Sequence, residues 1–373
     1  MKLTWPAVYA VLFIYRSIAS VFAVGVIVRL TTLGDSHAYA TLELEQWIEK
    51  SGFGLNSNVI TFLYGLAIRK LFFANEFIVS IAYQVISFVG IVMFLMSLEP
   101  KFRLRIVPLF FFPSFTVWTS IAGKETFVVL FVCLILKAVT DFAYRGRFSF
   151  VQVGIAFVGI VVFKPQFLPG TMYLFGLILI VAPFRIKASL VAGAFMVTVT
   201  ILFALRPFLE IFGPELFLAH FTGDNARTNR PPFWTEEGDL FAKAAEGMWL
   251  AFVGPTLEEI KISVVHLFSY VESMVLLTIF LVHLLRDLPR IPLFCFLLGL
   301  GTIFWTLAPN YGAGVMNPGT AVRYRSDWIP VLYFCFTVLM TRDFGLALVE
   351  RFRKRKPASV DAPAVALSPA RPT

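Results

Sequence analysis

Three polar stretches that border long apolar runs contain the residues whose types and spacing suit chemistry. The first covers 28–39 and reads VRLTTLGDSHAY, with Asp35 just after an apolar run and Tyr39 one helical turn later. A carboxylate placed where a spanning helix leaves a bilayer lies close to lipid phosphates and to water. Such a group can take a proton from a hydroxyl, so Asp35 is a candidate general base beside Tyr39. The alternative interpretation is a capping aspartate, because 36–48 has the spacing of a short helix on the membrane surface.

The second stretch, 113–125, ends in Lys124 and Glu125 at the tip of a tight turn between two apolar runs. Glu125 is a candidate for orienting an acceptor or, with Asp35, for binding Mg²⁺ or Mn²⁺, since hard cations prefer oxygen ligands. The pattern requires no cofactor. Lys124, and Lys164 at the outer end of a later apolar run, are candidates for contacting a lipid phosphate. The alternative for Lys124 and Glu125 is an interfacial ion pair that ends two spans.

The third stretch, 310–325, is rich in Gly, Pro and Asn and delivers Arg323 and Arg325 just before the last apolar run. We interpret it as a loop that binds a phosphate, because Arg grips phosphate bidentately and glycines let backbone N–H groups approach an anion. The alternative is generic anchoring to lipid headgroups. Two residues apart, the arginines point to opposite sides of an extended segment, or about 200° apart on a helix. We therefore expect one to contact the phosphate and the other to secure the loop, for example on Asp327.

The composition indicates a membrane protein. The chain is 58% hydrophobic and only 15% charged, with 42 Phe, and its mean hydropathy is +0.80. Soluble domains are usually about a quarter charged, so part of this surface must face lipid. The net charge of +9 comes from short basic runs between apolar segments, which favours orientation in a membrane over nucleic-acid binding. The three cysteines are odd in number and lie in apolar runs, which disfavours disulfides and zinc sites.

We predict an all-α polytopic membrane protein with about ten transmembrane helices. The expected spans are 6–28, 77–98, 104–122, 125–143, 148–163, 168–184, 187–206, 263–285, 291–308 and 328–341. The apolar segment 59–74 is short and carries Arg69 and Lys70. If it lies on the surface, the loops richest in Lys and Arg all fall on one side, as in the cytoplasm. Both termini are then inside, with surface-lying helices in the first external loop.

The predicted domain covers 1–345, followed by a disordered cytoplasmic tail over 346–373. Its external loops are 29–76, 207–262 and 309–327, and loops of this length usually carry function. Within the second, 236–252 has the spacing of an amphipathic helix on the membrane surface.

Four charged residues lie in or at the edges of the apolar runs, where charges are costly and often functional. Lys137 can extend to the cytoplasmic face. Arg16 and Glu272 are at similar depth, so an ion pair between them is as good an interpretation as a catalytic role. Lys164 is the fourth. The histidines have no ligand spacing, and no metal site is predicted from them.

These features together resemble the GT-C superfamily of integral-membrane glycosyltransferases. The sequence from Gly34 to Tyr39 is similar to the family's first external loop, where an acidic residue, often followed by a tyrosine, follows the first span. The stretch from Pro113 to Glu125 is similar to its second acidic loop. The arginines near the last span are similar in kind to those of the family. The motifs are short, and they cover 1–145; the remainder is similar only in architecture.

The resemblance implies transfer of a sugar from a polyprenyl-phosphate-linked donor on the outer face of a bacterial cytoplasmic membrane, in cell-envelope polysaccharide biosynthesis. It implies a base role for Asp35, a supporting role for Glu125 and phosphate binding by Arg323, Arg325, Lys124 and Lys164. Many members carry a large soluble C-terminal domain that this chain does not have, so the expected acceptor is a lipid or glycan. The pattern contains no GxxxxGK[ST] loop, which disfavours a nucleotide donor.

Two alternatives remain. The arginine-bearing external loops are also similar to those of O-antigen and exopolysaccharide polymerases, which join two lipid-linked glycans. A polymerase needs a second basic cleft, for which Arg227 and Arg230 are the external candidates. A lipid-glycan transporter is the third class, and it predicts polar residues at mid-membrane on broken helices.

Overall fold

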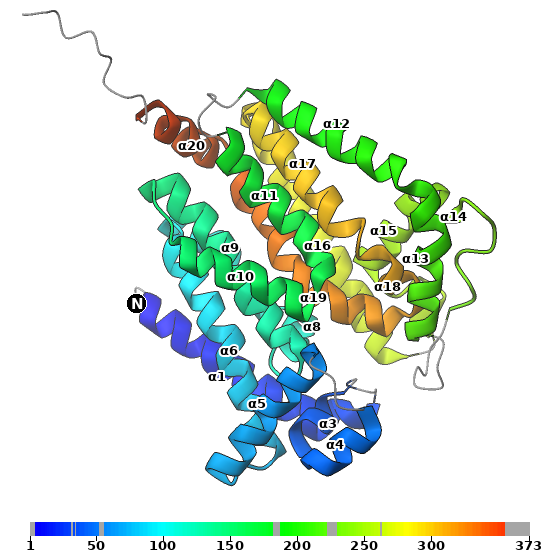
Figure 1. Cartoon of the computed structure of the whole chain (residues 1–373). Helices are drawn as coiled ribbons and strands as arrows, with labels where there is room; N and C mark the ends of the chain where they lie inside the picture. Colours follow the sequence, from blue (N-terminus) through cyan, green and yellow to red (C-terminus); the bar gives the residue numbers. More distant parts are fainter. Residues whose placement is uncertain are drawn as a thin grey trace, which may run out of the picture.

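The computed structural model describes the chain over 4–30, 33, 35–51, 56–181, 187–221, 230–261 and 263–354. Every element in these ranges is a helix, and the ranges contain no strand (Figure 1). The all-helical class predicted from the sequence is therefore confirmed.

The helices divide into two halves along the chain. The first half has α1 (Trp5–Phe22), the π-helical η1 (Ala23–Ile27), α2 (Val28–Leu30), α3 (Ser36–Thr41), α4 (Leu44–Ser51), α5 (Ser57–Phe72), α6 (Glu76–Ser97), α7 (Pro100–Ile106), the 3₁₀-helical η2 (Val107–Phe111), α8 (Pro113–Trp118), α9 (Lys124–Arg145), α10 (Phe150–Phe163) and the 3₁₀-helical η3 (Pro165–Phe167). The second half has α11 (Leu168–Val181), α12 (Ala188–Ala204), α13 (Arg206–Phe221), α14 (Asp239–Ala242), α15 (Ala244–Val253), the 3₁₀-helical η5 (Glu259–Lys261), α16 (Val264–Asp287), the 3₁₀-helical η6 (Leu288–Arg290), α17 (Leu293–Leu307), α18 (Tyr311–Met316), α19 (Pro318–Phe334), the π-helical η7 (Cys335–Leu339) and α20 (Arg342–Lys354).

Several helices are long and apolar enough to cross a membrane. Four satisfy this singly: Trp5–Ile27, Glu76–Ser97, Lys124–Arg145 and Val264–Arg290. Two pairs satisfy it only as bent units, Ala188–Ala204 with Arg206–Glu215 (68°) and Pro318–Leu339 with Arg342–Arg351 (83°). Four to six apolar helices of this length are consistent with an integral membrane protein, and they are fewer than the predicted number of about ten.

The difference comes from helices that are short or broken. α10, α11 and α17 have 14, 14 and 15 residues, below the roughly 20 that a span needs. The expected span 104–122 is divided among α7, η2 and α8. Pro108 and Pro113 stand at the starts of η2 and α8, and a proline lacks the N–H that a continuous helix requires.

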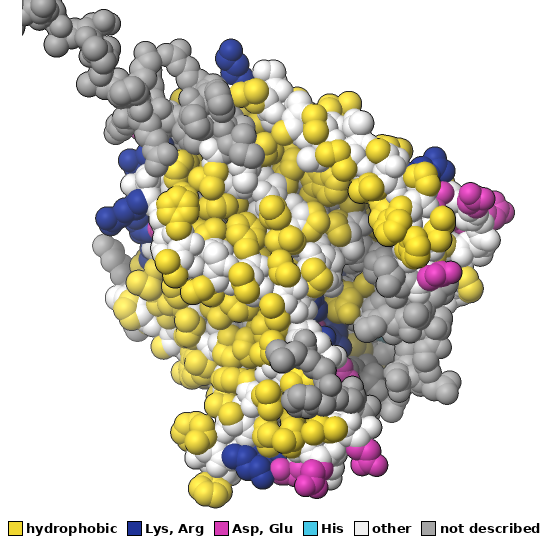
Figure 2. Space-filling view, viewed as in Figure 1, with side chains coloured by type: hydrophobic (Ala, Val, Ile, Leu, Met, Phe, Trp, Pro, Cys, Tyr) yellow, Lys and Arg dark blue, Asp and Glu magenta, His cyan; other side chains and the backbone are white. Residues whose placement is uncertain are grey.

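The outer surface of the molecule is rich in large hydrophobic side chains. On α10 alone, Phe150 is 77% exposed and Val151 72% exposed. Figure 2 shows hydrophobic side chains across the middle of one face, with most Lys, Arg, Asp and Glu at its margins. Exposed apolar patches of this extent are rare on soluble monomers and fit a lipid environment.

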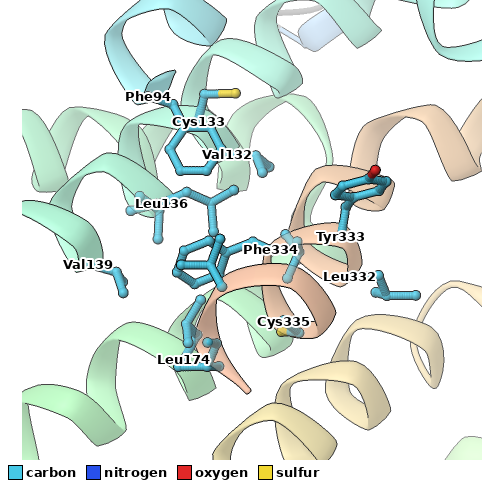
Figure 3. Packing of buried hydrophobic residues seen from close by; sticks show 14 of the residues in the cluster. Phe94, Val132, Cys133, Leu136, Val139, Leu174, Leu332, Tyr333, Phe334 and Cys335 are labelled. Carbon is cyan, nitrogen blue, oxygen red and sulfur yellow. The ribbon is translucent and has the colours of Figure 1, made fainter. Parts of the chain in front are cut away.

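Helix α9 lies at the centre of the packed core. It packs along α6 on one side and α10 on another, and α19 also contacts it. Figure 3 shows its Val132, Cys133, Leu136 and Val139 in one buried cluster with Phe334 and the other labelled side chains. The contact with α6 is close at Gly90, where an added Cβ would lie 2.7 Å from the Cα of Leu130. Only a residue without a side chain lets the two backbones approach this far.

One end of the molecule, which we call the basic end, joins the C-terminal parts of α9 and α16 to α7 and α20. Lys101 Nζ lies 2.6 Å from Asp343 Oδ2, and Arg105 Nη1 lies 3.4 Å from Asp287 Oδ2. Arg351 on α20 donates a hydrogen bond to the carbonyl of Tyr144. Three of the loops that the sequence places together on the basic side of a membrane, around 98–105, 144–149 and 286–291, therefore share one end of the fold.

Helices α3, α4 and α5 form a separate group next to the N-terminal end of α6 (Figure 1). Trp47 stacks on Phe62 with ring centroids 4.6 Å apart, and Tyr39 and Tyr83 join the same cluster. Arg69 Nη2 donates to the carbonyl of Leu42 at 2.5 Å and so caps the short helix α3. The segment expected to lie on the surface, 59–74, is the helix α5, which is not among the helices long enough to span a membrane.

Two other segments differ from expectation. The predicted amphipathic surface helix over 236–252 is divided at Lys243 into α14 and α15, and α15 packs against α18 and α19 with Ala251, Phe252 and Val253 buried. Helix α20 runs to Lys354, past the expected domain boundary at 345, because Phe344 and Leu348 bury an apolar face. The predicted disordered tail beyond 354 lies outside the described residues.

Candidate active site

Glu125 occupies the first turn of α9, at the end of the molecule opposite the basic end. Gly123 precedes the helix in an extended conformation, and an added Cβ there would lie 2.6 Å from Glu125 Oε2. The carboxylate therefore folds back over the helix N-terminus, where the helix dipole favours a negative charge. Its side chain is only 2% exposed, so its charge must be balanced locally.

Two cations balance Glu125, and both contact Oε1. Lys164 Nζ lies 3.0 Å away and Arg323 Nε lies 2.7 Å away. Lys164 also lies 2.5 Å from Asp327 Oδ2, and its ammonium stands 4.0 Å from the ring centroid of Tyr324. Two carboxylates and two cations thus form one buried ion network, which we call the buried network: Glu125, Lys164, Arg323 and Asp327.

Lys164 reaches this position because α10 stops beside it. Pro165 follows, and a proline disfavours the helical conformation in the residue before it. Lys164 accordingly adopts φ −153° and ψ 81°, which ends α10 at Phe163. Its side chain is 6% exposed and lies between two carboxylates, so the expected contact of Lys164 with a lipid phosphate does not fit this geometry. Lys164 neutralises the network instead.

Arg323 is the member of the buried network that retains unused hydrogen-bond donors. Its Nε is committed to Glu125, and its guanidinium carbon stands 5.5 Å from the ring centroid of Trp118. Within the described ranges, the two terminal nitrogens have no hydrogen-bond partner. The side chain is 20% exposed. A planar guanidinium with both terminal nitrogens free suits bidentate contact with a phosphate.

Lys124 and Asp35 border this network without taking part in it. Lys124 is half-buried, Asp35 is exposed, and neither forms a hydrogen bond or ion pair through its side chain with another described residue. Their charges nevertheless interact with each other and with Arg323, so the three side chains belong to one neighbourhood. Asp35 stands at the N-cap position of α3, but its side chain accepts no capping hydrogen bond. The capping interpretation of Asp35 is therefore not supported.

Tyr39 is held inside the α3–α5 group rather than presented to a ligand. It is 1% exposed, and its hydroxyl donates to Asn58 Oδ1 at 2.8 Å. Burial, with the nearby charge of Asp35 adding to it, raises the pKa of Tyr39 well above its ordinary value. The expected substrate contact of Tyr39 is therefore replaced by a positioning role, because the neutral hydroxyl fixes α3 against α5 next to Asp35.

Arg325 belongs to a different cluster. It is 1% exposed, its Nη1 donates to the carbonyl of Phe252 at 2.9 Å, and its Nη2 lies 3.2 Å from Glu272 Oε1. Glu272 also accepts from the backbone N–H of Ser114 at 2.8 Å. Arg325 thus connects α19 to α15, α16 and α8, and it is not placed to bind a substrate phosphate. The two arginines serve separate clusters, as their spacing predicted, although the partner of Arg325 is Glu272 and not Asp327.

The suggested ion pair between Arg16 and Glu272 is wrong. Arg16 is fully buried, and its Nη2 donates to Ser87 Oγ at 2.7 Å and to the carbonyl of Thr119 at 2.8 Å. Thr119 ends the short helix α8, whose last carbonyls have no partner within the helix. The guanidinium therefore caps α8.

The arginines lie on a helix and not, as expected, on a loop. Asn317 caps α19 by accepting from the N–H groups of Gly319 and Thr320, and Pro318 stands in its first turn. Helix α19 therefore begins about ten residues before the apolar run 328–341, from which a span was predicted. Four positions apart, Arg323 and Asp327 share one helix face, and this i, i+4 spacing was a usable signal for the buried network. The expectation that most candidate residues lie in external loops is wrong for Arg323, Arg325 and Asp327.

Glu125 does not fit the divalent cation suggested for it with Asp35. Its Oε1 already contacts two cationic side chains, which would repel Mg²⁺ or Mn²⁺. Among the residues that the structure describes, no group of three or more His, Cys, Asp or Glu side chains could hold a metal ion. The charge in this site is provided by Lys and Arg.

Of the two basic residues expected to line a second cleft, Arg230 is fully engaged. Its Nε lies 2.7 Å from Glu259 Oε1, and it donates to the carbonyls of Gly254 and Gly314 at 2.6 and 2.8 Å. It connects the chain after 230 to α15 and α18. Arg227 lies outside the described residues.

No family model, no curated protein and no solved structure matches this chain. The resemblance to membrane glycosyltransferases therefore depends on the residues of the site and their spacing alone.

Proposed function

We propose that the chain is a membrane glycosyltransferase that moves a sugar from a polyprenyl-phosphate-linked donor to a lipid or glycan acceptor. The observation that carries the proposal is the exposed carboxylate Asp35, which forms no ion pair with another described residue and whose charge interacts with those of Lys124 and Arg323. Both cationic groups keep hydrogen-bond donors that no described residue uses. A base next to a phosphate-binding pair is what transfer from a phosphorylated lipid requires. The proposed location is the outer face of a bacterial cytoplasmic membrane, with both termini in the cytoplasm.

In the proposed step, the acceptor hydroxyl oxygen forms a bond to the anomeric carbon of the donor sugar. The bond from that carbon to the phosphate oxygen breaks, and the polyprenyl phosphate leaves with the electron pair. The hydroxyl proton passes to the Asp35 carboxylate, a role that typically contributes a factor of about 10²–10⁴. Lys124 and the free nitrogens of Arg323 neutralise the departing phosphate, which is usually the larger contribution.

The buried network supports this step by holding Arg323 in place and by balancing its own charges. Glu125 holds Arg323 through Nε, and the terminal nitrogens have no hydrogen-bond partner among the described residues. Lys164 balances the remaining negative charge of Glu125 and Asp327, so the network needs no charge from the substrate. Arg323 is thereby fixed before a phosphate arrives, and preorganised groups stabilise charge without reorganisation cost.

The first prediction tests the base. In proteoliposomes supplied with a panel of radiolabelled polyprenyl-phosphate hexoses and membrane glycolipid acceptors, wild-type protein should release polyprenyl phosphate. Asp35→Asn should lower this release at least about 100-fold, because it removes the base and hardly changes volume. Glu49→Gln on α4 is the matched control, as an exposed carboxylate of the same helix group.

Binding of the donor separates the possible outcomes. Asp35→Asn should keep its affinity for the polyprenyl-phosphate sugar, since Lys124 and Arg323 remain. Normal turnover by Asp35→Asn would reject the base role. Absence of transfer by the wild type with every donor would reject the glycosyltransferase proposal itself.

A transporter is the second candidate, and one observation favours it. Lys164, Asp327 and Glu272 are buried charges on or between apolar helices, which is the placement expected for a transport path. A transporter would move a fluorescent polyprenyl-phosphate sugar from one leaflet to the other with no acceptor present. The transferase would leave that lipid in its leaflet and consume it only when an acceptor is added. The polymerase alternative needs a second basic cleft, and Arg230 does not supply one.

A further inference from the structure

A second group of cations lies far from the candidate active site, where α9 ends and α10 begins. Lys137, Arg145 and Arg147 line a pocket of about 470 Å³ together with Asp141, Phe148 and Ser149. At about 1.5 Å per residue along α9, Lys137 lies about 18 Å and Arg145 about 30 Å from Glu125. It belongs to the basic end, and nothing in the proposed transfer uses it.

The charges of the pocket do not cancel. Among the described residues that line the pocket, Asp141 is the one carboxylate, and it pairs with both Lys137 and Arg145. Arg147 is exposed and forms no hydrogen bond or ion pair through its side chain with another described residue. Three cations against one anion leave an excess of two positive charges around the cavity. An anion is the ligand that this excess would bind.

The backbone turn after α9 brings the start of α10 to the pocket. Gly146 ends α9 with φ +70°, and after this turn Arg147 lines the same pocket as Arg145. Ser149 then caps α10 by accepting from the N–H of Gln152. The other N–H groups of the first helical turn have no partner within the helix, and they favour an oxygen-rich anion.

An apolar strip continues from the pocket along α10. Phe150, Val151, Ile155 and Val158 are 77%, 72%, 56% and 64% exposed. Figure 2 shows basic side chains beside exposed hydrophobic ones at this end of the molecule. A free phosphate would use the cations alone, whereas a lipid would use the cations for its headgroup and the strip for its acyl chains.

We propose that this pocket is a binding site for an anionic glycerophospholipid. Arg145 pairs with Asp141 through Nη1 and donates to the carbonyl of Met96 through Nη2 at 3.5 Å, which leaves its Nε without a described partner. The headgroup phosphate contacts Arg147 and this Nε, and the acyl chains lie along α10. Asp141 keeps Lys137 and Arg145 in place. The site is independent of the proposed transfer, since none of its residues belongs to the candidate active site.

The test measures lipid binding to the purified full chain in neutral detergent by native mass spectrometry. Dioleoylphosphatidylglycerol is the anionic probe and dioleoylphosphatidylcholine the neutral one. Wild-type protein should bind one phosphatidylglycerol saturably and show no such site for phosphatidylcholine. Arg147→Gln should weaken binding about fivefold, corresponding to ~1 kcal/mol for one basic residue at a membrane surface. Arg147→Glu, which reverses the charge, should abolish the preference.

Arg290→Gln is the matched control. Arg290 is exposed at the same basic end, has no described side-chain partner and lies outside the pocket. Its replacement removes the same charge and should leave the affinity unchanged. Because Arg147 has no described partner to lose, Arg147→Gln should melt at the wild-type temperature.

Three results would overturn the proposal. Equal weakening by Arg290→Gln would show a general effect of surface charge. Equal saturable binding of phosphatidylcholine would show that the cations are not used. Full displacement of the lipid by soluble glycerol 3-phosphate at matched concentration would show a free-phosphate site in place of a lipid site.

Discussion

Lys164 separates two carboxylates that would otherwise face each other without charge compensation. Glu125 and Asp327 both approach its ammonium within hydrogen-bond distance, and all three side chains are nearly inaccessible. Desolvation makes each isolated charge expensive, so the stability of the cluster depends on its completeness. Asp327 has a further oxygen, Oδ1, that is buried and lacks a described partner. Among the described residues, its desolvation is therefore compensated by Lys164 alone, through Oδ2.

Removing the central cation should therefore destabilise the protein strongly. Lys164→Met leaves Asp327 without a cation, and we expect a loss of about 3–5 kcal/mol in the free energy of unfolding, as for other broken buried pairs. Thermal unfolding in detergent measures the effect. The double variant Lys164→Met/Asp327→Asn should recover part of the loss, because it removes the orphaned charge. Lys187→Met, at an exposed lysine, should change stability by less than about 0.5 kcal/mol.

The two arginines of α19 should respond differently to conservative replacement. Arg323→Lys keeps the charge near Glu125 but loses the planar group, so transfer should fall at least about tenfold while the melting temperature changes little. Arg325→Lys disturbs the contacts to Phe252 and Glu272 and should lower the melting temperature instead. Parallel assays of transfer and thermal unfolding distinguish the two effects. Unchanged transfer by Arg323→Lys would remove this arginine from the phosphate site.

At the scale of the helices, the position of Asp35 depends on how closely α3 approaches α5. Gly65 on α5 faces the backbone carbonyl of Tyr39, and a Cβ at this position would overlap it. The oxygen belongs to the main chain and cannot rotate away. The two helices must separate if Gly65 acquires a side chain.

Gly65→Ala should consequently move α3 and displace Asp35 from Lys124 and Arg323. We expect a loss of about 1–3 kcal/mol in stability, typical of overpacking, together with reduced transfer. Gly154→Ala is the control, because this glycine also lies inside a helix and has no atom within 4 Å of its added Cβ. That variant should be neutral or more stable by up to about 1 kcal/mol, since Ala favours helix over Gly. Equal effects of the two substitutions would contradict the close approach.

The sequence predicts the helices better than their ends and partners. Hydropathy finds α1, α6, α9 and α16 because each is a long uninterrupted apolar run. It cannot find the start of α19, where the polar residues Arg323, Arg325 and Asp327 are helical because of an Asn cap and buried ion pairs. The ion pairs cannot be predicted from the sequence either. Lys164 is distant from Asp327 in the chain, and only the tertiary packing shows that the two are neighbours. Helix length follows local chemistry, whereas the buried network follows tertiary structure.

At the scale of the whole molecule, titratable side chains collect toward two ends. The basic end carries Lys101, Arg105 and Arg145, whereas the opposite end carries Asp35 and Glu125. Helix α9 contributes to both, with Lys124 at its start and Arg145 at its end. An excess of Lys and Arg marks the cytoplasmic side of a membrane protein.

Cysteine labelling in intact cells should reproduce this division. Single cysteines at positions 35 and 124 should react with a membrane-impermeant maleimide added outside, and cysteines at 103 and 145 should react only after the membrane is opened. The native Cys133, Cys295 and Cys335 are buried and should remain unlabelled. Labelling of positions 35 and 103 from the same side would contradict the proposed location of the candidate active site on the face opposite the basic end.

The π-helical turn Ala23–Ile27 has a consequence for the phase of the first helix. A π turn holds one residue more than an α turn over a similar rise, so the chain beyond it is rotated by about 100° relative to an uninterrupted α-helix. On one side of the turn, Arg16 and Ser20 face α8 and the turn that follows it. On the other side lies the last described turn of this helix, Val28–Leu30. The face that Val28–Leu30 presents relative to Arg16 thus depends on how many residues stand between Arg16 and Val28, and not only on which residues they are.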